Sequence, residues 1–355
     1  MVTIVDVARV AGVSKSTVSR VLDERLPRSG SATAERVRKV AAELGYVRDP
    51  LASGLRRVGT STVGVVVPHL TDTVMAMVYE EIAAGAASRG LFAVVATTDD
   101  QPETERVAVD SLVRRRVDGL ILTTARIDAP TLLGQNGHAV PHVLALRTNG
   151  TSAASLGDDR LGAHLATRHL LDLGHRRIGL VCGPPYASSA RDRHAGYCNA
   201  LAESGLPIDD TLLAGDSFSM EAGETAGRTL LDRPDPPTAI FAVNDNTAIG
   251  VMAAAHNLGL RIPEDLSLVG YNDIPIVSRL PVPLTTVRVP FQQIALGALD
   301  LLHDAGNDNP PRTLIAAPTL IPRRSTSAPG QSGRPLPVTP SKGPRSLEGA
   351  GTKST

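Results

Sequence analysis

The segment VDVARVAGVSKSTVSRVLDER, residues 5–25, decides the fold of the first part of this chain. Apolar residues recur at helical spacing in two short runs, and Gly12 stands between the runs. The runs consist of Ile4, Val7, Ala8 and Ala11, and then of Val18, Val21 and Leu22. Thr3 and Ser14 stand where a side-chain oxygen caps a helix, and Gly12 suits the left-handed turn that ends one. Two short helices joined in this way form a helix-turn-helix.

A third amphipathic helix follows, capped by either Ser31 or Thr33 and ending at Gly45. Its inward face consists of Val37, Val40, Ala41 and Leu44. We therefore predict an all-α helix-turn-helix headpiece over residues 1–46. Residues 47–60, VRDPLASGLRRVGT, contain proline and glycine and are predicted to form a hinge or linker.

Charge is distributed unevenly along the chain, although its formal net charge is zero. Residues 1–57 carry eleven Lys/Arg and six Asp/Glu, a net charge of +5, and residues 323–355 also carry +5. The segment between them carries −10. A small basic module on an acidic body indicates a polyanionic partner for the module. The tail, residues 326–355, is rich in Pro, Gly and Ser and is predicted to be disordered and inert.

The composition argues against secreted and membrane proteins. Hydrophobic residues make up 42% and charged residues 20%, as in ordinary globular proteins. Two cysteines do not make a disulfide scaffold. No apolar run reaches the ~18 residues of a membrane span, and the N-terminus MVTIVDVARV lacks an export signal. We expect a soluble cytoplasmic protein, associated with the nucleoid, in which Cys182 and Cys198 are inert thiols.

The second predicted helix presents polar residues on its outer side, near the end that enters the major groove in this architecture. Arg20 and Lys15 can donate to guanine O6 and N7, and Ser16 can match base edges or a phosphate. Ser14 and Ser19 suit phosphate contacts, which set register without reading sequence. These residues form the candidate DNA interface.

From Thr62 to about Ile321, apolar runs alternate with Ala/Leu-rich helical stretches. The predicted strands are Val63–Val67, Ala93–Ala96, Gly119–Leu122, His142–Leu146, Ile178–Cys182, Ala239–Val243 and Ser267–Tyr271. The predicted helices are Val74–Arg89, Thr104–Arg116, Arg160–Leu173, Arg191–Ser204, Glu221–Leu231 and Asn246–Leu258, with C-cap glycines at 90, 174, 205 and 259. This alternation predicts parallel sheets, and its length favours two α/β lobes.

Polar residues that follow strands are the candidates for binding a small molecule, because such sheets bind ligands at the carboxyl ends of their strands. They are His69, Asp72, Thr98, Asp99, Asp100, Arg147, Asp158, Arg193, Asn244, Asn272 and Asp273. Arginine offers a rigid fork of donors, and aspartate accepts from hydroxyls. The alternative is that they form salt bridges or caps, as expected for Asp245, an N-cap candidate. Phe218 either walls the pocket or belongs to the core.

The chain resembles the lactose/galactose-repressor (LacI/GalR) family over about residues 2–326. Beyond the opening segment, the motifs that carry the resemblance follow in the family's order. They are TAERVRKVAAELGYVRDPLASGLR, VRRRVDGLIL, DLGHRRIGLVCG, RDRHAGY, AIFAVNDNTAIGVMAAAHNLGLRIPEDLSLVGYND, LPVPLTTVRVP and LIPRRST. The resemblance implies a two-lobed effector domain over 61–325, similar to periplasmic sugar-binding proteins. Its N-lobe would span about 61–157 and 287–312, and its C-lobe about 158–286 and 313–325.

The resemblance also implies roles for residues in the DNA-binding part. Lys15, Ser16 and Arg20 would choose bases, while Thr17 and Ser19 support phosphate contacts, with Thr3 counted among the contacts. Residues 50–56 would become a hinge helix only on operator DNA, with Ala52 and Leu55 against it and Leu55 in the minor groove. Alternatively, Leu55 packs on the core.

The hinge departs from the family pattern at three positions. Arg48 stands where the family commonly has proline, and Ser53 where it often has arginine. Gly54 weakens a helix by about 1 kcal/mol.

The resemblance implies that Arg193, Asn244, Asn272 and Asp273 hold sugar-like hydroxyls of an effector between the lobes. Aromatic residues make up only 3% of the chain, so a stacking platform for a sugar or purine is poorly supplied and the ligand class stays open. The predicted protein is a homodimeric, sequence-specific regulator, most simply a repressor, with no enzymatic activity, cofactor or metal. Whether the effector releases or promotes DNA binding stays open as well.

Two other classes of protein compete with this interpretation. A solute-binding protein would need an export signal and would have no use for the headpiece. A sugar-active hydrolase or kinase with an accessory DNA module would turn over its ligand. The chain contains no G-x-S-x-G, G-x-x-x-x-G-K-[ST] or H-E-x-x-H motif that would support such an enzyme.

Overall fold

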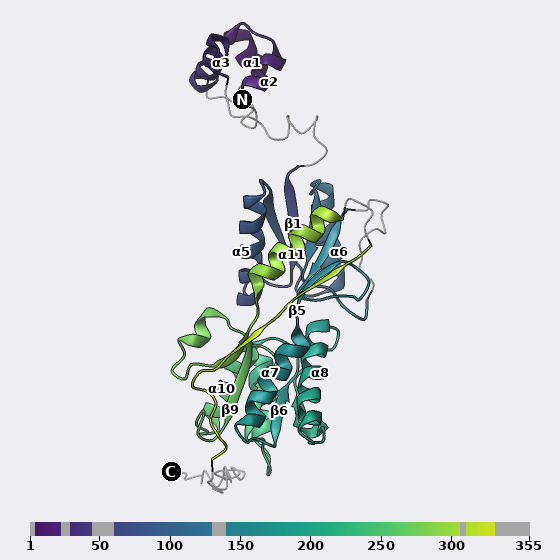
Figure 1. The fold of residues 1–355 in the computed structure, drawn as a ribbon, viewed down its shortest axis with the longest axis vertical. Coiled ribbons are helices and arrows are strands. Elements are labelled where there is room, and N and C mark those ends of the chain that lie inside the picture. Colours follow the sequence, from purple (N-terminus) through teal and green to yellow (C-terminus); the bar gives the residue numbers. More distant parts are fainter. Residues whose placement is uncertain (1–3, 23–28, 45–59, 130–139, 306–309, 331–355) are drawn as a thin grey trace, which may run out of the picture. The chain divides into compact units, whose positions relative to one another are not determined.

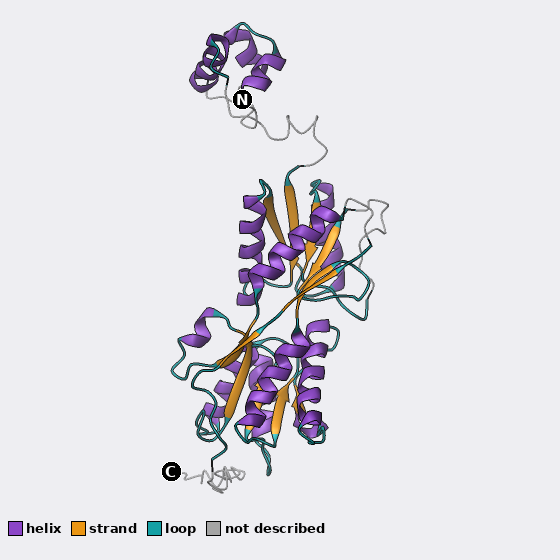
Figure 2. Cartoon of the chain, viewed as in Figure 1, coloured by secondary structure: helices purple, strands orange, loops and turns teal. Residues whose placement is uncertain are grey.

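The computed structural model describes residues 4–22, 29–44, 60–129, 140–305 and 310–330 of the 355-residue chain. The predicted cap Thr3, the hinge with Ala52 and Leu55, and residues 331–355 lie outside these ranges. The described chain consists of a small helical domain and two α/β sheets with their helices (Figure 1, Figure 2). None of the helices within these ranges is long and apolar enough to cross a membrane.

The headpiece consists of α1 (Ile4–Ala11), α2 (Lys15–Val21) and α3 (Ala32–Glu43), as predicted. Ser14 caps α2 by accepting from the Thr17 amide at 3.2 Å, and Gly12 has a φ of +68° in the turn before it. Of the two candidates for the cap of α3, Ser31 takes this role, and its hydroxyl accepts from the Ala34 amide.

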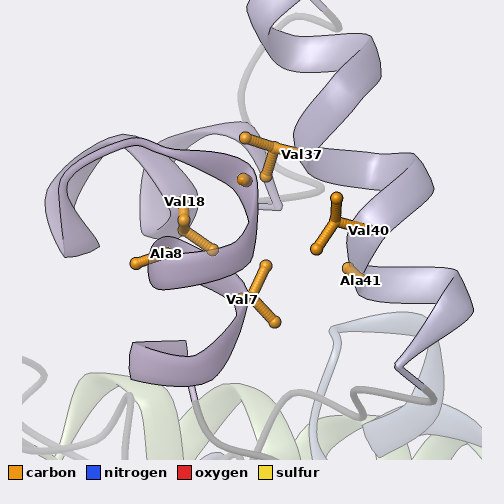
Figure 3. Packing of buried hydrophobic residues seen from close by; sticks show 7 residues of the cluster. Val7, Ala8, Val18, Val37, Val40 and Ala41 are labelled. Atoms are coloured by element: carbon orange, nitrogen blue, oxygen red, sulfur yellow. The ribbon is translucent and has the colours of Figure 1, made fainter.

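The fully buried core of the headpiece consists of valines and alanines, and Val13, Val21, Leu22 and Leu44 pack against it. Its buried residues are Val7, Ala8, Ala11, Val18, Val37, Val40 and Ala41 (Figure 3). Fully burying a valine contributes roughly 1.5–3 kcal/mol, so this domain has little stability to lose. Small side chains allow the three helices to pack close together.

The first sheet has the strand order β11-β5-β4-β3-β1-β2. Its strands are β1 (Thr62–Val67), β2 (Phe92–Thr97), β3 (Gly119–Leu122), β4 (His142–Ala145), β5 (Ala154–Gly157) and β11 (Thr313–Ala316). Its helices are α5 (Thr73–Ser88), α6 (Pro102–Arg114) and α11 (Phe291–Asp304). β1 lies inside the sheet, parallel to β2 and β3, and every residue from Val63 to Val67 is buried. Helices α5 and α11 pack against each other.

The second sheet has the order β12-β10-β9-β8-β6-β7. Its strands are β6 (Ile178–Val181), β7 (Leu213–Ala214), β8 (Ala239–Ala242), β9 (Ser267–Asn272), β10 (Thr285–Arg288) and β12 (Thr319–Ile321). Its helices are α7 (Asp159–Asp172), α8 (Ser188–Glu203), α9 (Met220–Leu231) and α10 (Asp245–Asn257). Only the β10–β12 pair is antiparallel among the pairings of these described strands. Parallel sheets with covering helices confirm the predicted α/β fold class.

The chain divides into two compact units, and it passes between them three times. Residues 1–155 and 291–314 form the first unit, and residues 156–290 and 315–355 form the second. The division falls after Ser155, after Pro290 and after Leu314.

The start of the tail is bound to the second sheet, so the expectation of disorder is wrong for residues 326–330. The buried Ser325 hydroxyl donates to the Leu268 carbonyl at 2.6 Å and accepts from the Thr285 amide at 2.8 Å. Nε2 of His175 lies 2.9 Å from the Ser327 carbonyl. The apolar content of this segment is low, but its hydroxyls and carbonyls find partners along β9, β10 and the end of α7.

Glycines set the close approach of α9 and α10. A Cβ atom on Gly250 would lie 2.0 Å from the Met220 carbonyl oxygen, and one on Gly223 would lie 2.3 Å from that of Thr247. At Gly227, on the same interface, the nearest atoms would be 3.1 Å away and include the Ala254 side chain. The two backbones therefore leave no room for a methyl group at Gly250.

Gly250→Ala should destabilise the protein by about 1–3 kcal/mol, because the two helices must move apart to admit the methyl group. Gly227→Ala is the matched control on the same helix pair and should cost less. Urea unfolding followed by circular dichroism measures both. Equal stability of Gly250→Ala and wild type would contradict the close-packing argument.

Acidification should weaken the attachment of the tail segment. Burial lowers the pKa of His175 below its usual 6.5, and burial also lowers that of His169, whose Nε2 lies 3.0 Å from the Thr326 hydroxyl. The unfolded chain therefore takes up protons first as the pH falls below about 6.5. The free energy of unfolding should decrease from there down to the folded-state pKa values.

The test compares wild type with His175→Gln in urea unfolding at several pH values between 7.5 and 5. The variant should lose less stability over this range, and His256→Gln, at an exposed position, should behave like wild type. The comparison with wild type cancels the opposite contribution of buried acids. If His175→Gln keeps the full slope, the histidine is not responsible.

Candidate functional site

The outer face of α2 presents the predicted base-reading residues to solvent. Lys15, Ser16 and Arg20 are exposed, while Val18 on the opposite side is fully buried. Ser14 Oγ lies 2.8 Å from the Ser16 hydroxyl and 2.9 Å from the Thr17 hydroxyl. The hydroxyls at the start of α2 therefore form one cluster beside exposed cationic side chains.

The remaining predicted DNA contacts are less exposed or lie elsewhere. Thr17 and Ser19 are half-buried. Thr3, Ala52 and Leu55 lie outside the described residues. Only the part of the interface on α2 is therefore described, and it places cations and hydroxyls on one face.

Several candidates gather at the carboxyl ends of β1 and β2. His69 Nδ1 lies 3.3 Å from Asp99 Oδ1, and both side chains are exposed. Asp72 is the N-cap of α5 and accepts from the Val74 amide at 3.0 Å. Asp99 and Asp100 both have left-handed backbones, with φ of +52° and +54°. Two such residues in succession are unusual outside glycine, and strain of this kind concentrates at functional sites.

Arg147 follows β4 and forms an ion pair with Asp100 through one guanidinium nitrogen. Its Nη1 lies 2.9 and 3.1 Å from the two carboxylate oxygens, and the arginine is only 4% exposed. Half-buried Glu105 belongs to the same charge group: burial raises its pKa and Asp100 adds to this, while Thr124, Arg147 and Arg126 oppose it. The pair was not predicted, although both residues were named as strand-end candidates.

In the second sheet, Asn244 is the N-cap of α10. Its side-chain oxygen accepts from the Thr247 amide at 2.8 Å, and its Nδ2 donates to the Phe218 carbonyl at 3.0 Å. The prediction that Asp245 is the cap is therefore wrong. Asp245 is the first helical residue, and its carboxylate accepts from the Ile274 amide and the Thr286 hydroxyl. Burial raises the pKa of Asp245 to about 7.

Phe218 is half-buried against a small apolar cluster. The cluster consists of Ala187, Ala190 and Val243, with Tyr186 beside it. The ring therefore packs on the loop that follows β6, next to the Asn244 cap, and it is neither fully exposed nor plain core. Both roles considered for Phe218 stay compatible with this position.

Arg193 lies at the centre of a buried polar group. Its Nε donates to Asp159 at 2.8 Å, its Nη1 donates to the Val243 carbonyl at 2.7 Å, and its guanidinium lies 3.9 Å from the centre of the Tyr271 ring. Burial raises the pKa of Asp159, and the attraction of Arg193 opposes this. Gly162 allows the ring to approach, because a Cβ there would lie 2.2 Å from the tyrosine hydroxyl.

The other predicted residues of the second unit either cap a helix, form ion pairs or end a strand. Asp158 caps α7 by accepting from the Leu161 amide at 2.9 Å. Asp273 lies 2.7 Å from Arg288 and 2.5 Å from Arg323, with its side chain 6% exposed. Asn272 ends β9, buried, with a φ of +108°. Four of the predicted residues thus lie at the carboxyl ends of strands or in a helix that follows a strand: Arg193, Asn244, Asn272 and Asp273.

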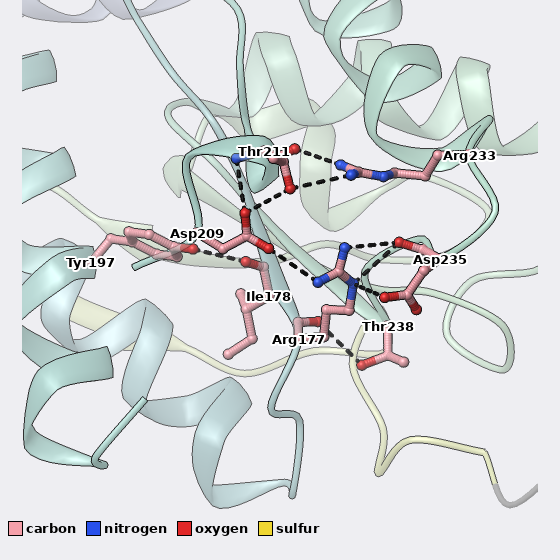
Figure 4. A network of polar contacts seen from close by, with 8 residues as sticks. All are labelled: Arg177, Ile178, Tyr197, Asp209, Thr211, Arg233, Asp235 and Thr238. Atoms are coloured by element: carbon pink, nitrogen blue, oxygen red, sulfur yellow. Dashed lines mark hydrogen bonds and ion pairs between the residues drawn. The ribbon is translucent and has the colours of Figure 1, made fainter. Parts of the chain in front are cut away.

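A second polar network lies at the amino ends of the strands of this sheet (Figure 4). Arg177, which precedes β6, contacts Asp209 at 3.2 Å and Asp235 at 3.1 Å, residues that precede β7 and β8. The Tyr197 hydroxyl donates to the Ile178 carbonyl at 2.8 Å. This network joins the loops at the amino ends of the strands, so we assign it to stability. Within the described ranges, no three His, Cys, Asp or Glu side chains gather as metal ligands would.

The sequence reasoning missed Asp159, Tyr271 and Arg323, which hold the predicted residues in place. Asp159 follows the named Asp158 directly, but nothing local distinguishes a capping aspartate from one that turns inward. Tyr271 ends a predicted strand, and its ring contacts the Arg193 guanidinium only because the fold brings α8 next to β9. A search for a buried counter-ion of Arg193 and of Asp273 could have found Asp159 and Arg323, since buried charges are paired, but not Tyr271.

Asp159→Ala should destabilise the protein by about 3–5 kcal/mol, because it leaves the buried Arg193 without its counter-ion. Asp172→Ala is the matched control: Arg168 Nε also lies 2.8 Å from Asp172, but that pair is exposed. The control should cost less than about 1 kcal/mol. Similar losses for both variants in urea unfolding would contradict the assigned importance of burial.

The comparisons with known proteins cover both parts of the chain. Residues 3–49 match the family described as bacterial regulatory proteins, lacI family, and residues 167–326 match the periplasmic binding protein-like domain. The HTH-type transcriptional regulator GalR of Escherichia coli K12 is 36% identical over 335 residues, 93% of this chain and 97% of its own. The repressor CytR of the same strain is 33% identical over 304 residues, 85% and 89% of the two chains.

Solved structures agree in fold. A lac repressor dimer bound to operator and the anti-inducer ONPF has a TM-score of 0.80 at 29% identity, over 92% of this chain and 99% of its own. A complex of the transcriptional regulator CelR with cellobiose has a TM-score of 0.70 at 30% identity, over 92% and 100%.

Proposed function

The chain belongs to the lacI family of bacterial regulatory proteins, and we propose that it represses transcription from a near-palindromic operator under the control of a small-molecule effector. Its relatives are transcription regulators, so it is a DNA-binding regulator and not an enzyme. The α2 surface carries the proposal: exposed Lys15, Ser16 and Arg20 stand on a rigid core within the segment matched to the family. Because its relatives are transcription regulators, the two alternative interpretations, a solute-binding protein and an α/β enzyme with a DNA module, are rejected.

For the DNA contacts, we assign base reading to Lys15, Ser16 and Arg20. The hydroxyls of Ser14, Thr17 and Ser19 contact phosphates and set register, together with Thr3. Ala52 and Leu55 of the hinge contact the minor groove, where an apolar wedge unstacks a base step. The exposed position of Arg20 and Lys15 beside the clustered hydroxyls supports this division of roles.

Two headpieces read two half-sites, so the active form is a homodimer or a higher oligomer. We assign residues 1–46 to the headpiece, 47–60 to the hinge and 61–325 to the effector domain. Its N-lobe spans about 61–157 and 287–312, and its C-lobe about 158–286 and 313–325. We place the protein in the cytoplasm, on the nucleoid, where its operator is.

For the effector, we assign polar residues near the carboxyl ends of the strands in each sheet, together with Phe218. They are His69, Asp72, Asp99 and Arg147 in the first sheet, and Asp158, Arg193, Phe218, Asn244, Asn272 and Asp273 in the second. A sugar-like molecule fits these groups best, because carboxylates and amides hydrogen-bond hydroxyls. Relatives with sugars bound, such as CelR with cellobiose, support this class.

Effector binding changes DNA affinity only if the effector distinguishes the two states of the protein. Genomic footprinting of the purified protein identifies the operator, and the neighbouring genes narrow the effector. Metabolites are then tested for release or strengthening of that complex. A protein that prefers no duplex sequence over random competitor DNA at moderate salt would refute the proposed function.

Arg20→Ala should weaken binding to the footprinted operator by about 1–3 kcal/mol and relax base preference at one position of each half-site. Lys39→Ala, on the exposed side of α3, is the control and should leave base preference unchanged. Fluorescence anisotropy with the operator and single-base variants, at one fixed salt concentration, measures both. Unchanged affinity and preference in Arg20→Ala would show that the recognition helix is wrongly assigned.

A further inference from the structure

The carbonyl group of Ala11 ends α1 at the turn of the helix-turn-helix, and its donor must come from outside that helix. The last four carbonyls of a helix have no donor within it. The backbone of the turn serves two of these four, because the Val13 amide donates to Ala8 at 3.0 Å and the Gly12 amide donates to Arg9 at 3.4 Å. Ala11 is only 2% exposed, so water does not readily replace a protein donor there.

A side chain of the third helix supplies this donor. Arg36 on α3 donates from Nε to the Ala11 carbonyl at 3.1 Å, across 25 residues of sequence. A cation is also favoured at the carboxyl end of a helix, where the helix dipole is negative. Val37, the residue after Arg36, is buried in the headpiece core (Figure 3). The arginine therefore joins the turn to a helix that is anchored in that core.

The position of Ala11 determines where the recognition helix begins. Ser14, the N-cap of α2, follows Ala11 after only Gly12 and Val13. Gly12 has a φ of +68°, which glycine adopts without strain. With so short a connection, a movement of the Ala11 carbonyl also moves the start of α2, where the exposed base-reading residues stand.

We propose that Arg36 is a positioning residue for operator recognition: its hydrogen bond to the Ala11 carbonyl fixes the turn and thereby the angle at which α2 presents its side chains. This inference rests on the proposed function, since it takes α2 as the recognition helix. Arg36 acts through the turn and does not touch the DNA. Base contacts depend on accurate placement of α2, whereas the general attraction of cations to phosphates does not. Specific binding therefore needs Arg36 more than nonspecific binding does.

The test compares Arg36→Met with wild type in the full-length protein, on the footprinted operator and on random duplex DNA of the same length. Methionine has a helix propensity close to that of arginine but no N–H donor. The ratio of specific to nonspecific affinity should fall about tenfold, as for the loss of one base contact. Fluorescence anisotropy at several salt concentrations measures both affinities.

The salt dependence separates positioning from a direct phosphate contact. The slope of log affinity against log salt concentration should be the same for Arg36→Met and wild type, because no phosphate contact is lost. A slope smaller by about one unit, with an unchanged affinity ratio, would identify Arg36 as a phosphate contact and overturn the proposal.

Arg38→Met is the matched control on the same helix. Arg38 also donates to a backbone carbonyl, that of Ser29 at 2.6 Å, but Ser29 precedes α3 and does not belong to the turn. This control removes the same charge and should keep the wild-type affinity ratio. Arg36→Lys can still donate to the Ala11 carbonyl and should restore most of the ratio that Arg36→Met loses.

The affinity ratio also separates positioning from a loss of folding. Both kinds of binding need a folded headpiece, so partial unfolding lowers both affinities together and leaves their ratio unchanged. An unchanged ratio in Arg36→Met, or equal losses in Arg36→Met and Arg38→Met, would therefore overturn the inference. If wild type itself does not prefer the operator, the proposed function fails, and this is seen before any variant is compared.

Discussion

The buried guanidinium of Arg193 is the constraint around which the second unit is organised. It reaches from α8 to Asp159 at the start of α7, to the Val243 carbonyl after β8, and over the ring of Tyr271 in β9. A buried charge is tolerated only when it is paired and hydrogen-bonded, so these four elements must keep their relative positions. The buried Arg193 side chain therefore holds together the elements at the carboxyl ends of these strands.

Small residues make that arrangement possible. Gly162 leaves room for Tyr271 between α7 and the sheet, and Gly270 lies against the Asp245 carboxylate, where a Cβ would be 2.3 Å from Oδ1. Asp245 in turn accepts from Ile274 and Thr286, which ties the start of α10 to β10 and to the loop after β9. Close backbone packing and buried polar groups thus depend on each other: the glycines create the space, and the hydrogen bonds satisfy the polar atoms that fill it.

Much of this fold could be predicted because its signals are local. Continuous apolar runs predict the inner strands β1, β3, β4, β6, β8 and β9, and glycines with positive φ stand at the predicted helix ends 90, 174, 205 and 259. The missed strands β5, β7, β10, β11 and β12 have two to four residues each. The predicted strands β3, β4, β6 and β8 also have four, but polar residues or glycine break up β5 (ASLG) and β10 (TTVR), so no continuous apolar run marks them. The helix α11 was also missed, although its buried residues recur at helical spacing.

The candidate site was predictable in residue type and not in pairing. Aspartate, asparagine and arginine after strands were foreseen, but their partners lie far along the chain: Asp159 is 34 residues from Arg193, Asp100 is 47 from Arg147, and Asp273 is 50 from Arg323. Such pairs depend on which strands become neighbours, which no local pattern encodes. The same limit explains why Asp245 was wrongly predicted to cap α10. The sequence does not show that its carboxylate accepts from Ile274 and Thr286 instead of from the first turn of the helix.

A structural role for these residues does not compete with a role in binding. Arginine has five N–H donors, and the contacts of Arg193 with Asp159 and Val243 use two of them. Asn244 accepts from Thr247 and donates to Phe218, which orients its amide without using its full capacity of two donors and two lone pairs. A ligand that meets donors and acceptors already held in position loses less entropy in ordering them than one that meets mobile side chains. Caps and ion pairs at the strand ends therefore fix the orientation of each polar group, as the proposed effector site requires.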